Sequence, residues 1–164
     1  MLIEVSGDIL LSKAHAVAHG VAPNDDFHTG LGLALRERWP AMYKDFRHYC
    51  HMSHPKAGEI WVWHGAEDTH IYNLFTQVEA YAHGSKPGRA TIENVNHCLH
   101  HLAKDLMKHE IKSLAVTKLG AGVQGGLIWE DVKQVMTNVL SHVEIPIFVY
   151  TMYHPNVAAK EEAH

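Results

Sequence analysis

The strongest indication of the architecture lies in residues 113–140, whose sequence is SLAVTKLGAGVQGGLIWEDVKQVMTNVL. Residues 114–116 form an apolar run typical of a buried strand, and a glycine-rich turn at 120–126 separates them from a helix expected to begin near Trp129. Glycines allow left-handed backbone angles and a close approach of a ligand to the main chain. Unpaired N–H groups in such a loop and at the helix start favour an anion. The segment therefore predicts a phosphate or diphosphate site.

Two other interpretations of these glycines have to be weighed. Gly120, Gly122 and Gly125 satisfy G-x-G-x-x-G, but a dinucleotide-binding Rossmann unit places this motif after its first strand. Here most of the sheet precedes the motif, one strand at 145–151 follows it, and Glu144 precedes that strand instead of ending it. Binding of NAD is therefore a disfavoured alternative. A turn that serves only tight packing is the other, although four glycines in seven residues exceed what a turn requires.

The composition bounds the class of protein. With 164 residues, of which 46% are hydrophobic and 20% charged, the chain fits one domain with a substantial core. No apolar run approaches the roughly 18 residues of a membrane span, and the start MLIEVSGDIL lacks the basic region of a signal peptide. Cys50 and Cys98 form neither a metal-type pair nor a disulfide framework. We therefore expect a cytoplasmic protein with no membrane partner.

The charged and titratable residues limit the classes of ligand that the protein is expected to bind. A net charge of −4 with mixed signs argues against wide electrostatic binding of nucleic acid. Sixteen histidines are scattered, without an H-E-x-x-H motif or a Cys/His cluster at zinc spacing. His97 and His101 stand at i and i+4 of an expected helix and could share a metal, but solvated histidines are commoner on such a face. We predict no metal and no cofactor.

Strands alternate with helices along the whole chain. Apolar runs predict strands at 2–5, 16–21, 59–64, 70–76, 114–116 and 145–151, and apolar stripes at helical spacing predict helices from about 32, after Pro40, over 92–107 and from Trp129 to 140. This alternation predicts an α/β fold, a three-layer α/β/α sandwich with a mixed, mostly parallel sheet of about six strands. The ligand loops should gather at one end of that sheet.

The remaining segments are expected to be loops or tail. Residues 77–90 are rich in Gly, Ser, Lys and Pro, and within them 83–88 is the candidate to close on a ligand. Asp8 could cap the segment that follows the first strand or accept a hydrogen bond from a ligand, and capping is the simpler role. The domain is expected over 1–153, with 154–164 a polar tail that joins no core.

Four segments, in this order, resemble the macro domain, the ADP-ribose-binding family, from Ile3 to Tyr150. The layout is most similar to the branch that holds the terminal ADP-ribose glycohydrolase and the yeast-type ADP-ribose-1″-phosphate phosphatase. The segments are Val5-Ser6-Gly7-Asp8-Ile9-Leu10, Gly30-Leu31-Gly32-Leu33-Ala34 with Arg38-Trp39-Pro40, Ile71-Tyr72-Asn73-Leu74-Phe75-Thr76-Gln77, and Gly120-Ala121-Gly122 leading to Trp129-Glu130.

The resemblance implies that the ligand is ADP-ribose, free or attached to a macromolecule, with nucleic acid a partner only if it carries ADP-ribose. It implies that Asp8 contacts adenine, that residues 29–32 surround the distal ribose and that residues 120–125 wrap the diphosphate. The implied ligand-binding residues are Asp8, Ile9, Thr29, Gly30, Leu31, Gly32, Thr76, Gly120, Ala121, Gly122, Val123, Gln124 and Gly125.

The catalytic residues depart from the family pattern. In the glycohydrolase of this branch a lysine after the Leu-x-Thr strand end attacks the sugar carbon, helped by an aspartate of the glycine loop. This chain has Gln77 at the lysine position and no aspartate in residues 123–126. An amide cannot be that nucleophile, because its nitrogen lone pair is delocalised. Lys86 or Lys118 could substitute, although nothing in the sequence places either beside the ribose.

A water-based reaction needs a base, and the catalytic candidates near the first ligand loop are His19, Asp25 and His28. We favour His19, because the phosphatase branch has a histidine at the end of the corresponding strand. A buried histidine bonded to backbone explains it equally well. Asx-turns that order the loop are the simpler interpretation of Asp25 and Asp26, and plain exposure is that of His28.

Two functions from different classes follow. One is a hydrolase that removes ADP-ribose from an ester-linked site, or phosphate from ADP-ribose-1″-phosphate. The other is a non-catalytic module that recognises ADP-ribose. Gln77 and the missing aspartate favour the module, whereas a single-domain chain favours the enzyme, because a module usually needs a fused partner. We favour the hydrolase.

Overall fold

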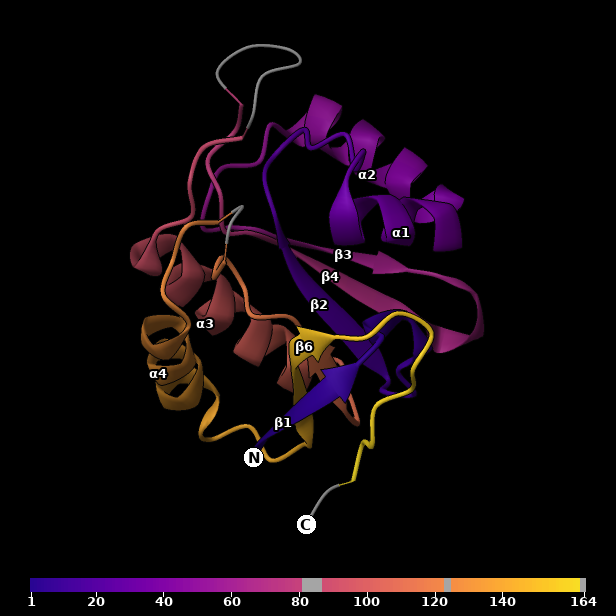
Figure 1. Cartoon of the computed structure of the whole chain (residues 1–164). Coiled ribbons are helices and arrows are strands. Elements are labelled where there is room, and N and C mark those ends of the chain that lie inside the picture. Colours follow the sequence, from indigo (N-terminus) through magenta and orange to yellow (C-terminus); the bar gives the residue numbers. More distant parts are fainter. Residues whose placement is uncertain (81–86, 123–124, 163–164) are drawn as a thin grey trace.

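A mixed sheet of six strands forms the middle layer of the protein. The computed structural model describes residues 1–80, 87–122 and 125–162 (Figure 1). The strands lie in the order β1-β6-β5-β2-β4-β3, and every neighbouring pair is parallel except β3 and β4. The strands are β1 (Leu2–Gly7), β2 (Ala16–Val21), β3 (Ile60–His64), β4 (His70–Phe75), β5 (Leu114–Val116) and β6 (Ile147–Tyr153).

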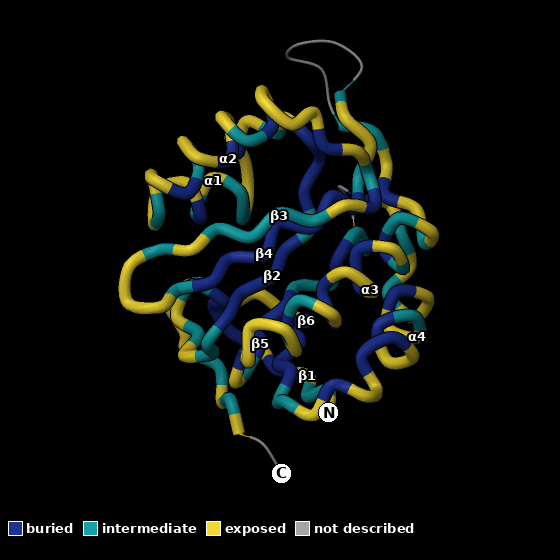
Figure 2. The backbone as a smooth tube through the Cα atoms, turned by 180° about the vertical axis from the view of Figure 1, so that it is seen from behind, coloured by how far each residue is buried: buried dark blue, intermediate teal, exposed yellow. Residues whose placement is uncertain are grey.

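The central strands are apolar along their whole length because both of their faces are covered. All six residues of β4 and all three of β5 are buried. Strands covered on both faces carry continuous apolar sequence instead of an alternation. The edge strand β3 is only partly buried. Figure 2 shows the contrast, with dark blue along β2 and β4 and yellow on the outer turns of the helices.

Two helices cover each face of the sheet (Figure 1). Helix α3 begins where the side-chain oxygen of Thr91 accepts the N–H of Asn94. Its buried stripe includes Leu99, Leu102 and Leu106, whose spacing of three and four residues directs them to the sheet. The helices on this face are α3 (Ile92–Lys108) and α4 (Trp129–Leu140), and those on the other face are α1 (Gly30–Arg38) and α2 (Pro40–Ser53).

The predicted fold class and order of elements are confirmed, with small differences at the strand ends. Strand β1 continues past Val5 to Gly7, because Gly7 pairs with Tyr153 beyond a bulge. Strand β6 begins at Ile147, two residues later than predicted, since Pro146 has no N–H to donate to a ladder. Local sequence indicates where a strand lies, but its partner decides where it ends.

The segment after β6 lies against the domain, contrary to the expectation of a tail that joins no core. Glu161 accepts hydrogen bonds from Ser12 Oγ at 2.6 Å, from Tyr150 Oη at 2.6 Å and from the Lys13 N–H at 2.9 Å. Ala159 packs against an apolar cluster that includes residues of β1 and β6. The backbone of this segment is also bonded to the domain, since the Asp8 N–H donates to the carbonyl of Val157 and the His154 N–H to that of Gly7. A polar segment held by such long-range hydrogen bonds has no compositional signature, which is why the sequence did not reveal it.

Among the described residues, no helix combines the length and the apolar sequence that crossing a membrane requires. Residues 83–86, most of the segment expected to close on a ligand, lie outside the described part of the chain. The same holds for residues 123 and 124 of the glycine turn.

Candidate functional site

A cavity of about 630 Å³ opens at the carboxyl ends of the parallel strands. Ligands of open α/β sheets bind at this end, because the loops that leave the strands form a crevice there. The volume is within the range of small-molecule sites, on the order of 300–1,000 Å³. The lining residues come from the ends of β1, β2, β5 and β6, from the loop before α1 and its first turn, and from the glycine loop.

The first turn of α1 brings an anion-binding group to the cavity. Thr29, Gly30, Leu31 and Gly32 all line it. Thr29 occupies the N-cap position, yet its side chain makes no capping hydrogen bond. The first N–H groups of a helix have no partner within the helix, and together with the helix dipole they attract an anion. The structure therefore offers a phosphate site at the start of α1.

The glycine loop forms a wall of the cavity, but several of its N–H groups are already used. The N–H groups of Ala121, Gly122 and Gly126 donate to the carbonyls of Lys118, Leu127 and Gly122, respectively. Among the described residues, none that lines the cavity belongs to α4, the helix that follows this loop. The helix start that lines the described part of the cavity is therefore that of α1, and the prediction that the start of α4 helps to hold an anion stays a prediction.

Close packing requires glycine at two positions of this loop. A Cβ atom at Gly125 would lie 2.0 Å from the carbonyl oxygen of Gly120. At Gly120 the backbone has φ of 77°, and a Cβ atom would lie 2.8 Å from that of Ala90. Both glycines also line the cavity. The packing role that the sequence left open and the ligand role are thus compatible.

The predicted ligand-binding residues divide into three groups. Asp8, Thr76 and Gly122 do not line the cavity. Val123 and Gln124 lie outside the described residues. The others line it, namely Ile9, Thr29, Gly30, Leu31, Gly32, Gly120, Ala121 and Gly125.

Asp8 acts as a cap in this structure. One carboxylate oxygen accepts the N–H of Leu10 and the other accepts the N–H of Asn156, each at 3.0 Å. The residue is 5% exposed. The capping role predicted from the sequence is therefore present. The resemblance also implied that Asp8 contacts adenine, and any such contact would be made by a carboxylate that already accepts two hydrogen bonds.

Thr76 lies beneath the cavity floor. It is fully buried, and its hydroxyl has no hydrogen-bond partner in the described part of the chain. A Cβ atom on Gly20, which does line the cavity, would lie 2.7 Å from this hydroxyl. The absent side chain of Gly20 therefore leaves room for Thr76 directly below the ligand space.

His19 lies inside β2, two residues before its end, and lines the cavity. Its Nε2 is 2.6 Å from Oδ1 of Asn73 on β4. The amide nitrogen of Asn73 donates to the carbonyls of Trp61 and Ile71, so its oxygen faces the ring and accepts. Nε2 therefore carries the proton, and Nδ1 is the acceptor nitrogen of the ring. Burial lowers the pKa of His19 to about 4, so the ring is neutral at pH 7.

Asp25 and His28 have different environments. Asp25 lines the cavity, accepts the N–H of Phe27 at 2.8 Å in an Asx-turn, and has its pKa raised chiefly by burial. His28 is exposed, bonds the carboxylate of Asp26 and does not line the cavity. That bond lowers the pKa of Asp26. Asp26 and His28 therefore have the simpler roles, ordering of the loop and exposure to solvent. Asp25 forms an Asx-turn and also lines the cavity.

Gln77 and Lys118 both line the cavity. The side-chain amide of Gln77 donates to the carbonyl of Gly88 at 3.1 Å, which joins the start of the loop to its end. Lys118 follows β5 by two residues and is half-buried. Of the described residues that line the cavity, it alone carries a permanent positive charge. Lys86, the other lysine considered as a substitute, lies outside the described residues.

The last strand contributes to the cavity as well, and none of its residues was among those predicted for the site. Tyr150, Thr151 and Tyr153 line the cavity at the carboxyl end of β6, where two aromatic rings offer apolar surface to a base. The signal was available, because the last strand of a parallel sheet must end at the same edge as the others.

Known proteins resemble the chain over most of its length, although no family model matches it. The DNA ADP-ribosyl glycohydrolase of Mycobacterium tuberculosis is 26% identical over 159 residues, which are 95% of this chain and 43% of the relative. The human ADP-ribose glycohydrolase OARD1 is 24% identical over 149 residues, 90% of each protein. The chain thus spans less than half the length of the mycobacterial relative.

Solved structures agree with the sequence relatives. The macrodomain of Thermus aquaticus DarG superposes with a TM-score of 0.80 at 27% identity, over 92% of this chain and 98% of that one. Thermosipho africanus DarTG in complex with ADP-ribose gives 0.77 at 24% identity, over 96% of this chain and 42% of that one. This chain therefore has the macrodomain fold and is a distant homologue of the DarG and OARD1 ADP-ribose glycohydrolases.

Proposed function

We propose that the cavity binds ADP-ribose and that the chain hydrolyses an ADP-ribose derivative, either an ADP-ribosyl ester or ADP-ribose-1″-phosphate. The observation that carries the proposal is that His19, Asp25 and Lys118 line the same cavity as the first turn of α1. Groups that bind an anion and groups that accept a proton thus meet in one space. Hydrolysis next to a diphosphate needs both.

Binding is supported by the chemistry of the lining. The start of α1 and the ammonium of Lys118 suit the diphosphate, and the rings of Tyr150 and Tyr153 suit an adenine base. The DarTG structure that resembles this chain holds ADP-ribose, which supports the choice of ligand.

For the reaction, we assign Asp25 as the general base and water as the attacking group. Burial raises the pKa of Asp25, which makes the carboxylate a stronger base, while His19 stays neutral and can orient the water through Nδ1. The water oxygen forms the new bond to the sugar carbon or to phosphorus, its proton passes to Asp25, and the bond to the leaving oxygen breaks. That oxygen departs as a carboxylate from an ester, or takes the proton from Asp25 when it is the sugar oxygen of the phosphate. A lysine nucleophile is not required.

One observation favours a second candidate, the non-catalytic ADP-ribose-binding module. Gln77 stands where the family has its attacking lysine, and its amide is bonded to Gly88. A chain that had lost turnover and kept the pocket would show this pattern.

Two measurements separate these candidates. Calorimetric titration with ADP-ribose, compared with NAD and AMP, should show a marked preference for ADP-ribose. Absence of detectable binding would contradict both the hydrolase and the binding module. Turnover is then assayed on ADP-ribose-1″-phosphate, on an ester-linked ADP-ribosyl peptide and on ADP-ribosylated DNA. Asp25→Asn and His19→Ala should abolish turnover with affinity largely kept, whereas His48→Ala, which changes an exposed histidine of α2, should do neither. Binding without turnover on all three substrates would favour the module.

A further inference from the structure

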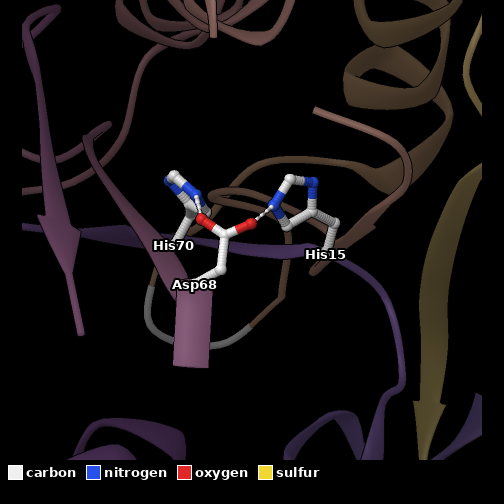
Figure 3. A group of neighbouring side chains, drawn as sticks. All are labelled: His15, Asp68 and His70. Carbon is white, nitrogen blue, oxygen red and sulfur yellow. Dashed lines mark hydrogen bonds and ion pairs between the residues drawn. The ribbon is translucent and has the colours of Figure 1, made fainter. Parts of the chain in front are cut away.

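A second group of titratable side chains lies at the amino ends of β2 and β4, the end of the sheet opposite the cavity (Figure 3). His15 immediately precedes β2 and His70 begins β4, and Ala16 pairs with His70 in the parallel register. The register therefore brings the two rings together, with centroids 4.8 Å apart. Asp68 lies between them, with one oxygen 2.7 Å from His15 Nε2 and the other 2.8 Å from His70 Nε2.

The turn between β3 and β4 holds the carboxylate in this position. Asp68 has a φ of 59°, a left-handed angle that few residues other than Gly, Asn and Asp adopt. The turn is closed by the N–H of Gly65, which donates to the carbonyl of Thr69, and by the N–H of Thr69, which donates to that of Ala66. The side chain of Asp68 is 74% exposed, whereas that of His70 is 10% exposed. One ligand of the group is thus anchored in the core and another is open to solvent.

We propose that His15, Asp68 and His70 form a binding site for a divalent transition-metal ion, with Zn²⁺ as the preferred ion. Their ligand atoms all lie within 4.8 Å of one another. Zinc takes imidazole nitrogen and carboxylate oxygen at about 2.0–2.2 Å, so on binding the two rings would draw together around the ion, and the exposed Asp68 would shift to make room for it and ligate it with one oxygen. Mg²⁺ and Ca²⁺ prefer oxygen ligands and are disfavoured. Water would complete the coordination.

The protons of the site determine what the ion must displace. The N–H of Lys112 donates to His15 Nδ1 at 3.0 Å, so without metal the His15 Nε2 carries the proton that it donates to Asp68. An ion at Nε2 takes the place of that proton. Nδ1 then gains one, and the Lys112 N–H must turn to water, which its exposed position allows. This rearrangement marks the site with a specific signal, the amide of Lys112.

The buried side of the site also changes. Nδ1 of His70 is buried and has no hydrogen-bond partner in the described part of the chain. With an ion on Nε2 this atom becomes an unpartnered N–H donor, which opposes binding. Because the protein supplies only three ligands and the His70 N–H is left without a partner among the described residues, we expect a lower zinc affinity than that of a structural site with four protein ligands. Its effect would be to tie the turn between β3 and β4 to the start of β2, far from the ADP-ribose cavity.

The test titrates ZnCl₂ into untagged, metal-free protein. We expect one calorimetric site that Asp68→Asn weakens at least tenfold, a rise of Tm with Zn²⁺ that the variant loses, and a shift of the Lys112 amide resonance on binding. The matched control is the double variant His97→Ala/His101→Ala, which removes an i, i+4 pair of histidines on α3 and should bind as the wild type does. Circular dichroism in EDTA checks that each variant folds, and His15→Ala replaces Asp68→Asn if the latter does not.

Three outcomes would overturn the proposal. Zn²⁺ affinity unchanged in Asp68→Asn and in His15→Ala would show that the ion binds elsewhere. An equal loss in the α3 control would show binding to surface histidines in general. A Lys112 amide that stays in place at saturating Zn²⁺ would show that His15 does not ligate the ion.

Discussion

Nε2 of His19 lies 2.6 Å from Oδ1 of Asn73, and the two residues face each other across neighbouring parallel strands. Both are buried, with exposures of 3% and 0%. The bond stabilises one tautomer, while burial disfavours the charged ring. The cavity therefore has a neutral histidine whose orientation is set by the sheet.

We expect acid to destabilise the protein through His19. Its pKa is about 4 in the folded chain against an ordinary 6.5, so between these values the unfolded chain binds the proton more readily. The free energy of unfolding should fall by up to about 3 kcal/mol as pH drops through this range. Above pH 6.5 the ring is neutral in both states, so His19 should not make the stability depend on pH there. Urea titrations at pH 7 and 4.5 measure it. His19→Gln should lose this dependence and His48→Gln should keep it, and equal slopes in all three proteins would contradict the assignment.

Asn73→Asp should raise the pKa of His19, because a carboxylate at hydrogen-bond distance stabilises the imidazolium. An increase of about 1 to 3 is the usual effect of such a neighbour. Titration of the ring by NMR measures it, with Asn138→Asp, an exposed site on α4, as the control. If the ring titrates as before, the bond to Asn73 is not maintained in solution.

Gly125→Ala should disrupt the glycine loop, since its Cβ atom would lie 2.0 Å from the Gly120 carbonyl oxygen. We expect a lower Tm and at least a tenfold loss of ADP-ribose affinity. Gly32→Ala is the matched change, because its Cβ atom would meet Phe27 at an ordinary 3.4 Å within a helix. Alanine there should raise stability by up to about 1 kcal/mol. Unchanged affinity in Gly125→Ala would remove the loop from the site.

Glu161→Ala should destabilise the protein by about 1–3 kcal/mol, because Ser12 and Tyr150 would lose the acceptor of partly buried hydroxyls. Urea unfolding measures the change. Glu162→Ala removes an exposed neighbouring carboxylate and should stay within about 0.5 kcal/mol of the wild type. Equal stability of the two variants would mean that the hydrogen bonds of Glu161 to Ser12 and Tyr150 do not stabilise the protein.

Lys118→Met should weaken ADP-ribose binding about tenfold, on the order of 1.4 kcal/mol, by removing a positive charge from the cavity. The remaining affinity should depend less on salt, since less of it is electrostatic. Calorimetry at low and high ionic strength tests both effects. Lys104→Met on the exposed face of α3 should change neither, and a loss that is the same at both salt concentrations would argue for packing instead of charge.

The sequence predicted features that depend on neighbours along the chain. The apolar stripe of α3 repeats over a few helical turns, and the apolar run of β5 consists of three consecutive residues, so both can be recognised locally. The loop at Gly30 and Gly32 is recognisable as a motif. What it could not show depends on register. His19 and Asn73 are 54 residues apart, and only the alignment of β2 with β4 makes them partners.

The same limit explains the remaining differences. His70 lies two residues from Asp68 in sequence, but His15, the third proposed ligand, lies 53 residues away, and only the fold brings it to the carboxylate. The hydrogen bond that the Asp8 carboxylate accepts from the N–H of Asn156 spans 148 residues. A carboxylate that serves the backbone looks the same in sequence as one that serves a ligand, so its role had to come from the fold.

The order of the sheet also bears on synthesis. Strand β1 lies at an edge, and β6 is its one neighbour in the described sheet. During synthesis β1 must therefore wait for residues 147–153 before it can pair, and contacts so distant in sequence form slowly. Until then β1 is an open strand edge that another nascent chain could join. A chaperone that covered this edge during translation would prevent such pairing.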